Sequence, residues 1–340
     1  MSRTRELAEL ATAYDSGTPL GFRNRIINGD MRIAQRGTAA VTADNAYPVD
    51  RINIAFDTDG AYSAQQSTTA PVGFTNSVQW TTTTADASLG STQRALVMHN
   101  IEGFNAADLG WGAANAQAVT LSFWVRSSLT GTFGGSIANS DQNRSYPFTY
   151  TISAANTWEQ KTITVPGDTT GTWATNNGLG IRVRFGMGVG SGLSGTAGVW
   201  AGSDFRSATG AVNVMGTLNA TWFLTGVQLE AGSVATPFER RPYGTELALC
   251  SRYFQSFVAV GSINYWGGTG RLRFQLPVQM RAAPTFALTG TGDASGLTTL
   301  SGGSFTESFT TAGRYDNTTS ALANWESASA YIPISASAEL

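Results

Sequence analysis

Residues 119–128 read VTLSFWVRSS, and this segment decides the fold class. Apolar and polar side chains alternate along it with a period of two, which is the pattern of a β-strand that buries one face. The buried face is predicted to carry Val119, Leu121, Phe123 and Val125. The opposite face is predicted to carry Thr120, Ser122, Trp124 and Arg126.

Strand patterns continue on both sides of this segment. They occur in FTYTIS (148–153), TWEQKTITVPGD (157–168), LGIRVRFGMGVGSG (179–192) and TWFLTGVQLEAG (221–232), and residues 77–104 are expected to hold an early strand pair. In 179–192 the alternation places Ile181, Val183 and Phe185 inward and Arg182 and Arg184 outward. A series of short strands separated by turns predicts an all-β sandwich or barrel.

The composition of the 340 residues agrees with this prediction. Charged residues make up only 13%, hydrophobic residues 41%, and there are 39 glycines, which suits strands joined by many tight turns. Lysine occurs once, at Lys161. Because lysines guard exposed sheet edges, we expect the edges to be covered or paired, in part between chains.

Charge and residue counts exclude several functional classes. The net charge of −2 gives no footprint for nucleic acid, and no apolar run is long enough for membrane insertion. The MSRTREL start has no apolar stretch, so no secretory signal is predicted. One cysteine and one histidine rule out a disulfide framework and the common zinc sites.

The chain divides into three predicted parts. Residues 1–20 form a short N-terminal helix, with Thr4 as cap and Leu7, Leu10 and Tyr14 on one face. Residues 21–243 form the sandwich, and residues 244–340 form a small C-terminal β domain. In this domain, Pro277 and Pro284 bound a predicted edge strand at 278–283, because proline removes ladder donors.

The order of these elements resembles the jelly-roll sandwich of carbohydrate-binding modules. The resemblance rests on SFWVRSS (122–128), NTWEQKTITVPGD (156–168) and LTGVQLEAGSVATPFERRP (224–242). Together with FRNRIINGDMRIAQRGT (22–38), the last of these segments is similar to phage tail-fibre and adhesin proteins. LPVQMRAAPTF (276–286) is similar to their C-terminal domain.

This resemblance implies a protein of the phage tail fibre, located in the virion and forming a homotrimer. Its expected partners are other tail or baseplate proteins and host surface polysaccharide or lipopolysaccharide. Virion attachment is expected from the helix residues Leu7, Leu10 and Tyr14 and from Arg23 and Arg25. No cofactor is expected beyond a structural calcium ion, for which no ligands are assigned.

Four tryptophans in turn-like segments are the candidate glycan-binding residues: Trp111, Trp173, Trp200 and Trp266. Sugar rings stack their C–H faces on aromatic rings, and neighbouring polar groups satisfy the hydroxyls. The alternative is that tryptophan fills the core or contacts between chains, as is expected of Trp124 and Trp158 on strands.

Catalysis is not predicted. Cys250 would need a histidine base, and nothing connects it to His99, the only one, which is expected to be hydrogen-bonded at a strand end. The aspartates occur in turn-like surroundings, where they bind their own backbone. Two alternatives to an adhesin stay open: a structural virion component such as a baseplate or head decoration protein, and a glycan-cleaving tailspike with two opposed carboxylates.

Overall fold

The computed structural model describes residues 22–266, 269–289, 292–294, 297–300, 304–308, 312–317 and 327–340. The predicted N-terminal helix lies outside these residues. The chain divides into two compact units, residues 1–241 with Leu340, and residues 242–339. Each unit is described by itself.

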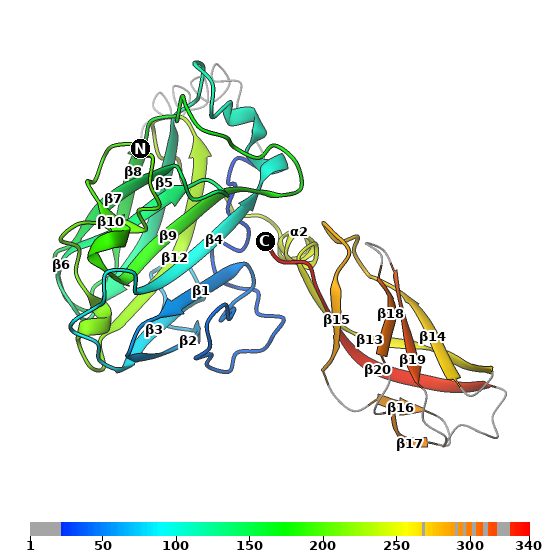
Figure 1. Ribbon diagram of the computed structural model, residues 1–340. Helices are drawn as coiled ribbons and strands as arrows, with labels where there is room; N and C mark the ends of the chain where they lie inside the picture. The colour runs from blue at the N-terminus through cyan, green and yellow to red at the C-terminus, as the bar shows by residue number, and fades with distance from the viewer. Residues whose placement is uncertain are drawn as a thin grey trace. The chain divides into compact units, whose positions relative to one another are not determined.

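The first unit is a jelly-roll sandwich of two five-stranded antiparallel sheets (Figure 1). The first sheet has the order β1-β4-β9-β6-β7 and the second β2-β3-β12-β5-β8. The strands of the first sheet are β1 (Ile52–Asp57), β4 (Arg94–Glu102), β9 (Leu179–Val189), β6 (Gly131–Ala138) and β7 (Ser145–Ile152). Those of the second are β2 (Ala61–Ser67), β3 (Ser77–Thr84), β12 (Thr221–Ala231), β5 (Val119–Ser127) and β8 (Glu159–Val165).

Strand β5 confirms the alternation of the deciding segment. Its inward residues are fully buried between the sheets: Val119, Leu121, Phe123 and Val125. Trp80 and Trp222 fill the same core and are also fully buried. Trp124 and Trp158 are partly exposed, so they do not fill the core, and the alternative that they lie in contacts between chains stays a prediction. Trp124 lies on the outer face of its sheet, because it alternates with the buried residues of β5.

The early strand pair of residues 77–104 exists as two strands that do not pair. Strand β3 pairs with β2 and β12 in one sheet, whereas β4 pairs with β1 and β9 in the other. Between β3 and β4 the chain passes from one sheet to the other. Sequence proximity suggested a hairpin, but each strand buries its apolar face from a different side of the core.

Strand β9 confirms the inward prediction for Ile181, Val183 and Phe185, all of which are buried. Arg184 also lies on the outer face, but it is buried there because Asp204 and Gln142 cover it and accept its hydrogen bonds. Outward direction in a strand is therefore not the same as contact with solvent.

The single lysine lies on the edge strand β8. Lys161 is opposite Phe123 of β5, which places it on the inward-facing side, and it forms an ion pair with Glu159 at 2.6 Å. A charged residue on the inner side of an edge strand opposes pairing with another sheet. The one lysine thus guards one edge of the sandwich.

Two short 3-10 helices, η1 (Gly103–Asn105) and η2 (Ala107–Leu109), connect β4 to β5. Two others, η3 (Ser191–Leu193) and η4 (Val214–Gly216), and the short strands β10 (Ser194–Gly195) and β11 (Ser207–Ala208) lie between β9 and β12. These connections carry the candidate site described below.

The second unit begins with helix α2 (Tyr243–Ser251), which follows Pro242. Its sheet has the order β17-β16-β20-β13-β14-β19-β18, with β15 paired to β20. The bounds are β13 (Phe254–Trp266), β14 (Thr269–Gln275), β15 (Thr285–Leu288), β16 (Gly292–Ala294), β17 (Leu297–Leu300), β18 (Ser304–Ser308), β19 (Ala312–Asn317) and β20 (Ser327–Ser337). Within the described part of this unit, Phe274, Phe286 and Ile334 belong to one small core.

The predicted edge strand at 278–283 is wrong, because these residues form an irregular connection between β14 and β15. The backbone of Val278 is satisfied by one side chain instead of a neighbouring strand. Its N–H donates to Gln255 Oε1 at 3.3 Å, and its carbonyl accepts from Gln255 Nε2 at 2.5 Å.

Candidate glycan-binding site

Three of the four candidate tryptophans lie together at one end of the sandwich. Trp111 follows η2, Trp173 lies between β8 and β9, and Trp200 lies between β10 and β11. Their ring centroids are 4.6 Å apart for Trp111–Trp173, 5.4 Å for Trp111–Trp200 and 5.6 Å for Trp173–Trp200, all edge-to-face. Three loops that are distant in sequence therefore meet through aromatic contacts.

A cavity of about 130 Å³ opens beside this cluster. Besides Trp111 and Trp173, it is lined by Ile181, by Thr175 and by the small residues Ala106, Ala107, Gly110, Ala113, Ala174 and Gly180. The lining is largely apolar. We call this the aromatic cavity.

The indole N–H groups are already bonded within the chain. Trp111 Nε1 donates to Gln117 O at 2.7 Å, Trp173 Nε1 to Thr170 O at 3.3 Å, and Trp200 Nε1 to Pro166 O at 2.8 Å. These bonds hold the rings in place. What the tryptophans can offer a ligand is therefore ring surface, and Trp111 is nearly buried while Trp173 and Trp200 are partly exposed.

An ion pair between Arg144 and Asp168 lies next to the tryptophan cluster. Arg144 donates from Nε to Asp168 Oδ2 at 2.7 Å and from Nη2 to Asp168 Oδ1 at 2.6 Å. These bonds raise the pKa of Arg144 above its usual range. The guanidinium also lies 5.9 Å from the Trp200 ring centre, and Asp168 O accepts from the Gly112 N–H at 2.7 Å. Arg144 therefore occupies both oxygens of the Asp168 carboxylate.

Phe104 is a candidate that the sequence analysis missed. It lies in η1, its N–H donates to Asn176 O at 2.9 Å, and its side chain is 60% exposed. The same loops line the aromatic cavity through Ala106 and Thr175. The signal was present in the sequence, because Phe104 stands between Gly103 and Asn105 much as Trp111 stands between two glycines.

Trp266 belongs to the second unit and ends β13, where it is paired with Thr269 of β14. Its side chain lies outside the described part of the structure. The prediction that Trp266 binds glycan is therefore separate from the prediction for the other three tryptophans, which belong to the first unit.

Arg23 and Arg25, predicted to serve virion attachment, have partners within the chain. Arg25 binds Asp108 through both nitrogens, at 2.7 and 2.6 Å, and Arg23 Nη2 donates to Pro237 O at 2.7 Å. Leu7, Leu10 and Tyr14 lie outside the described residues. Attachment through these five residues stays a prediction.

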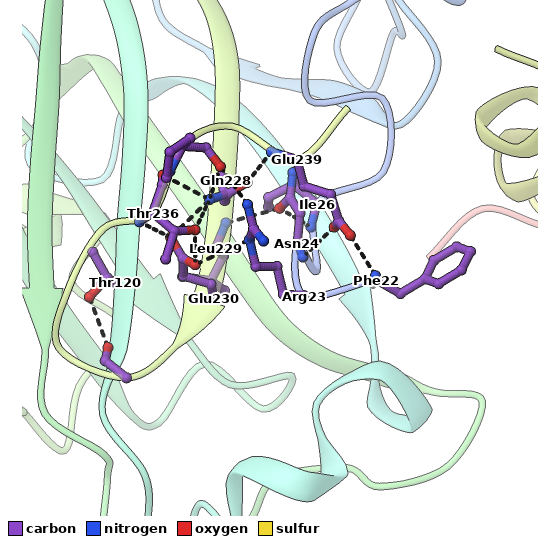
Figure 2. Close-up of polar contacts among 12 residues, drawn as sticks. Phe22, Arg23, Asn24, Ile26, Thr120, Gln228, Leu229, Glu230, Thr236 and Glu239 are labelled. Carbon is purple, nitrogen blue, oxygen red and sulfur yellow. Dashed lines mark hydrogen bonds and ion pairs between the residues drawn. The ribbon is translucent and has the colours of Figure 1, made fainter. Parts of the chain in front are cut away.

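The segment containing Arg23 packs along the end of β12 and the residues that follow it (Figure 2). Asn24 Oδ1 accepts from the N–H groups of Ile26 and Leu229, both at 3.0 Å. Glu239 accepts from the Phe22 N–H at 2.5 Å and the Asn24 N–H at 2.8 Å. We call the contact between residues 22–26 and 228–239 the N-to-C contact. It joins two of the segments that resemble phage tail proteins.

His99 is buried within β4, not at a strand end. Its Nε2 lies 3.2 Å from the Ile27 nitrogen and 3.1 Å from the Ile27 oxygen. Burial, followed by the nearby charge of Arg51, holds its pKa well below the usual range. The ring is therefore neutral and structural.

No group of three or more His, Cys, Asp or Glu side chains lies close enough to hold a metal ion within the part of the chain that the structure describes. The calcium ion implied by the resemblance stays a prediction. Cys250 is buried in α2, in a different unit from His99. Among the described residues, no helix is long and apolar enough to span a bilayer.

Comparisons with known proteins returned structural likenesses alone. No protein family matches the sequence, and no curated protein matches it. A carbohydrate-binding module of family 4 is similar with 13% identity and a TM-score of 0.33, covering 61% of this chain and 99% of its own. The family 11 module of a Clostridium thermocellum cellulase has 10% identity and a TM-score of 0.29, covering 58% and 96%.

The enzymatically active domain of tailspike protein 4 from bacteriophage CBA120 is also similar, with 12% identity and a TM-score of 0.29. The match covers 62% of this chain but only 22% of the tailspike chain. All three TM-scores lie below 0.5.

Proposed function

We propose that this protein is a phage tail adhesin that binds host surface polysaccharide or lipopolysaccharide through the aromatic cavity, without breaking a bond. The observation that carries the proposal is the convergence of Trp111, Trp173 and Trp200 beside a cavity, with the exposed ring of Phe104 on the same loops. Exposed aromatic surface next to a small cavity suits the C–H face of a sugar ring.

The cavity is small and shallow, so each site is expected to bind weakly. Fibres meet a surface with several copies at once, and linked sites multiply weak binding into useful avidity. A homotrimer would supply three such sites, and this is the oligomer that the sequence resemblance implies.

The assignment to a phage tail rests on the segments 22–38 and 224–242. Both segments contribute to the N-to-C contact (Figure 2). The attachment of the virion through residues 1–20 is part of the proposal.

The experiment is a cell-binding assay with the full chain and with the fragments 1–241 and 242–340. The proposal predicts that the full chain and fragment 1–241 bind host cells and that extracted surface polysaccharide competes for this binding. Binding by fragment 242–340 alone would move the site to the second unit. No binding by any of the three would leave a structural virion component as the better assignment, and shortening of the polysaccharide during the assay would indicate a tailspike.

A further inference from the structure

Three arginines gather on the outer face of the first sheet, around one carboxylate. Arg184 Nη1 donates to Asp204 Oδ1 at 2.7 Å, and Arg206 Nε donates to Asp204 Oδ2 at 2.8 Å. Arg182 precedes Arg184 by two residues in β9, on the same face, and its electrostatic neighbours are Asp204 and Arg206. Two guanidiniums bind the carboxylate of Asp204 and the third is only its electrostatic neighbour, so the cluster keeps an excess of positive charge.

Arg182 differs from the other two arginines in its hydrogen bonding. Arg184 and Arg206 both donate to Asp204, whereas Arg182 forms no hydrogen bond or ion pair with any of the described residues, and its Nε is buried without a partner. Burial lowers its pKa, the nearby carboxylate of Asp204 opposes this effect, and the charge of Arg206 adds to it. A partly buried cation with unused donors is costly to the free protein and is stabilised when an anion binds.

Arg182 follows two residues of β9 that line the aromatic cavity, Gly180 and Ile181. Gly180 and Arg182 are two residues apart on the same face of a strand, a separation of about 7 Å. A sugar ring in the cavity would therefore bring its own substituent, or the next ring, within reach of the guanidinium.

We infer that Arg182 recognises an anionic group on the bound sugar, and that the site takes an acidic polysaccharide whose repeat carries a carboxylate or a phosphate. This inference rests on the proposed function. The planar guanidinium offers paired donors that match two oxygens of either group, which a lysine would not. Asp204 and Gln142 hold the neighbouring Arg184 in place and leave Arg182 for the ligand.

The test uses the full chain and the polysaccharide extracted from cells that it binds, in three forms: native, carboxyl-reduced and dephosphorylated. The variants are Arg182→Gln and Arg182→Lys, with Arg94→Gln as the matched control. Arg94 lies at the other end of the same strand pair, opposite Val189, and forms a surface ion pair with Asp57. Thermal unfolding of each variant shows whether it is folded.

The expected result is a loss of affinity of about tenfold or more for Arg182→Gln, and a similar loss for wild type when the acidic group is removed. The form that fails to bind distinguishes carboxylate from phosphate. Arg182→Lys is expected to lose less affinity than Arg182→Gln, and Arg94→Gln is expected to keep the wild-type affinity. If Arg182→Gln does not fold, the comparison of the three polysaccharide forms with wild type still decides whether an acid is recognised.

Unchanged binding of all three forms would overturn the inference and leave the proposed function standing. The inference would also be overturned if removal of the acidic group weakened binding but Arg182→Gln did not, because the acidic group would then be recognised by another residue. Absence of any cell or polysaccharide binding by wild type would overturn the proposed function itself, and the inference with it.

Discussion

At the scale of single residues, Asn24 connects the start of the sandwich to its last strand. The side chain is buried, its oxygen accepts from Ile26 and Leu229, and its Nδ2 donates to Val227 O at 3.1 Å. Gly29 lies in the turn that follows, and a Cβ there would approach Val227 O of β12 to 2.2 Å. The residue types in FRNRIING (22–29) therefore suit close contact with β12.

Replacing Asn24 should destabilise the first unit markedly. Asn24→Ala leaves three buried backbone groups without partners, and we expect the free energy of unfolding to fall by about 3 kcal/mol. Chemical denaturation measures this change. Asn76→Ala is the control, because Asn76 contacts an exposed threonine hydroxyl, and it should change stability by less than about 0.5 kcal/mol. Equal stability of the two variants would contradict the role given to the N-to-C contact.

At the scale of elements, the buried histidine of β4 makes the stability of the sandwich depend on pH. His99 stays neutral in the folded state because burial lowers its pKa, whereas in the unfolded chain it takes up a proton near pH 6.5. The contribution of His99 to the free energy of unfolding is therefore fully present above about pH 6.5. It decreases as the pH falls below this value, because only the unfolded state gains the proton.

The expected slope is up to about 1.4 kcal/mol per pH unit between pH 6.5 and 5.5. The chain has a single histidine, so the slope in this range can be assigned to it. Denaturation of wild type and of His99→Gln at several pH values tests this. A variant that keeps the wild-type slope would show that other groups cause it.

The elements also show how far sequence reasoning reaches. Period-two alternation in 119–128 and 179–192 predicted which side chains face the core between the sheets, because the alternation of faces is a local property of a strand. It did not predict that Thr120, Ser122 and Arg184 are buried on the outer face. Alternation could not predict that β3 and β4 belong to different sheets, because pairing depends on contacts distant in sequence. The meeting of Trp111, Trp173 and Trp200 depends on three loops, so the sequence predicted the residue types but not their shared site.

At the scale of the whole molecule, the chain enters and leaves the sandwich at one place, since residues 22–26 bind residues 228–239 (Figure 2). Each unit has its own core. We expect calorimetry of the full chain to give two unfolding transitions, and removal of residues 242–340 to abolish one and leave the other unchanged. A single cooperative transition would contradict the independence of the two units.

Glycan binding at the aromatic cavity is tested by the affinity of three variants for the polysaccharide of the bound cells. Trp173→Ala removes aromatic surface that lines the aromatic cavity, and Phe104→Ala removes an exposed ring from one of the loops that line it. Trp158→Ala removes a partly exposed ring that packs on Phe223 elsewhere in the sandwich. The account predicts a large loss of affinity for the first two, with unfolding temperatures that still indicate a folded protein, and wild-type affinity for Trp158→Ala. Undiminished binding by Phe104→Ala and Trp173→Ala would contradict it.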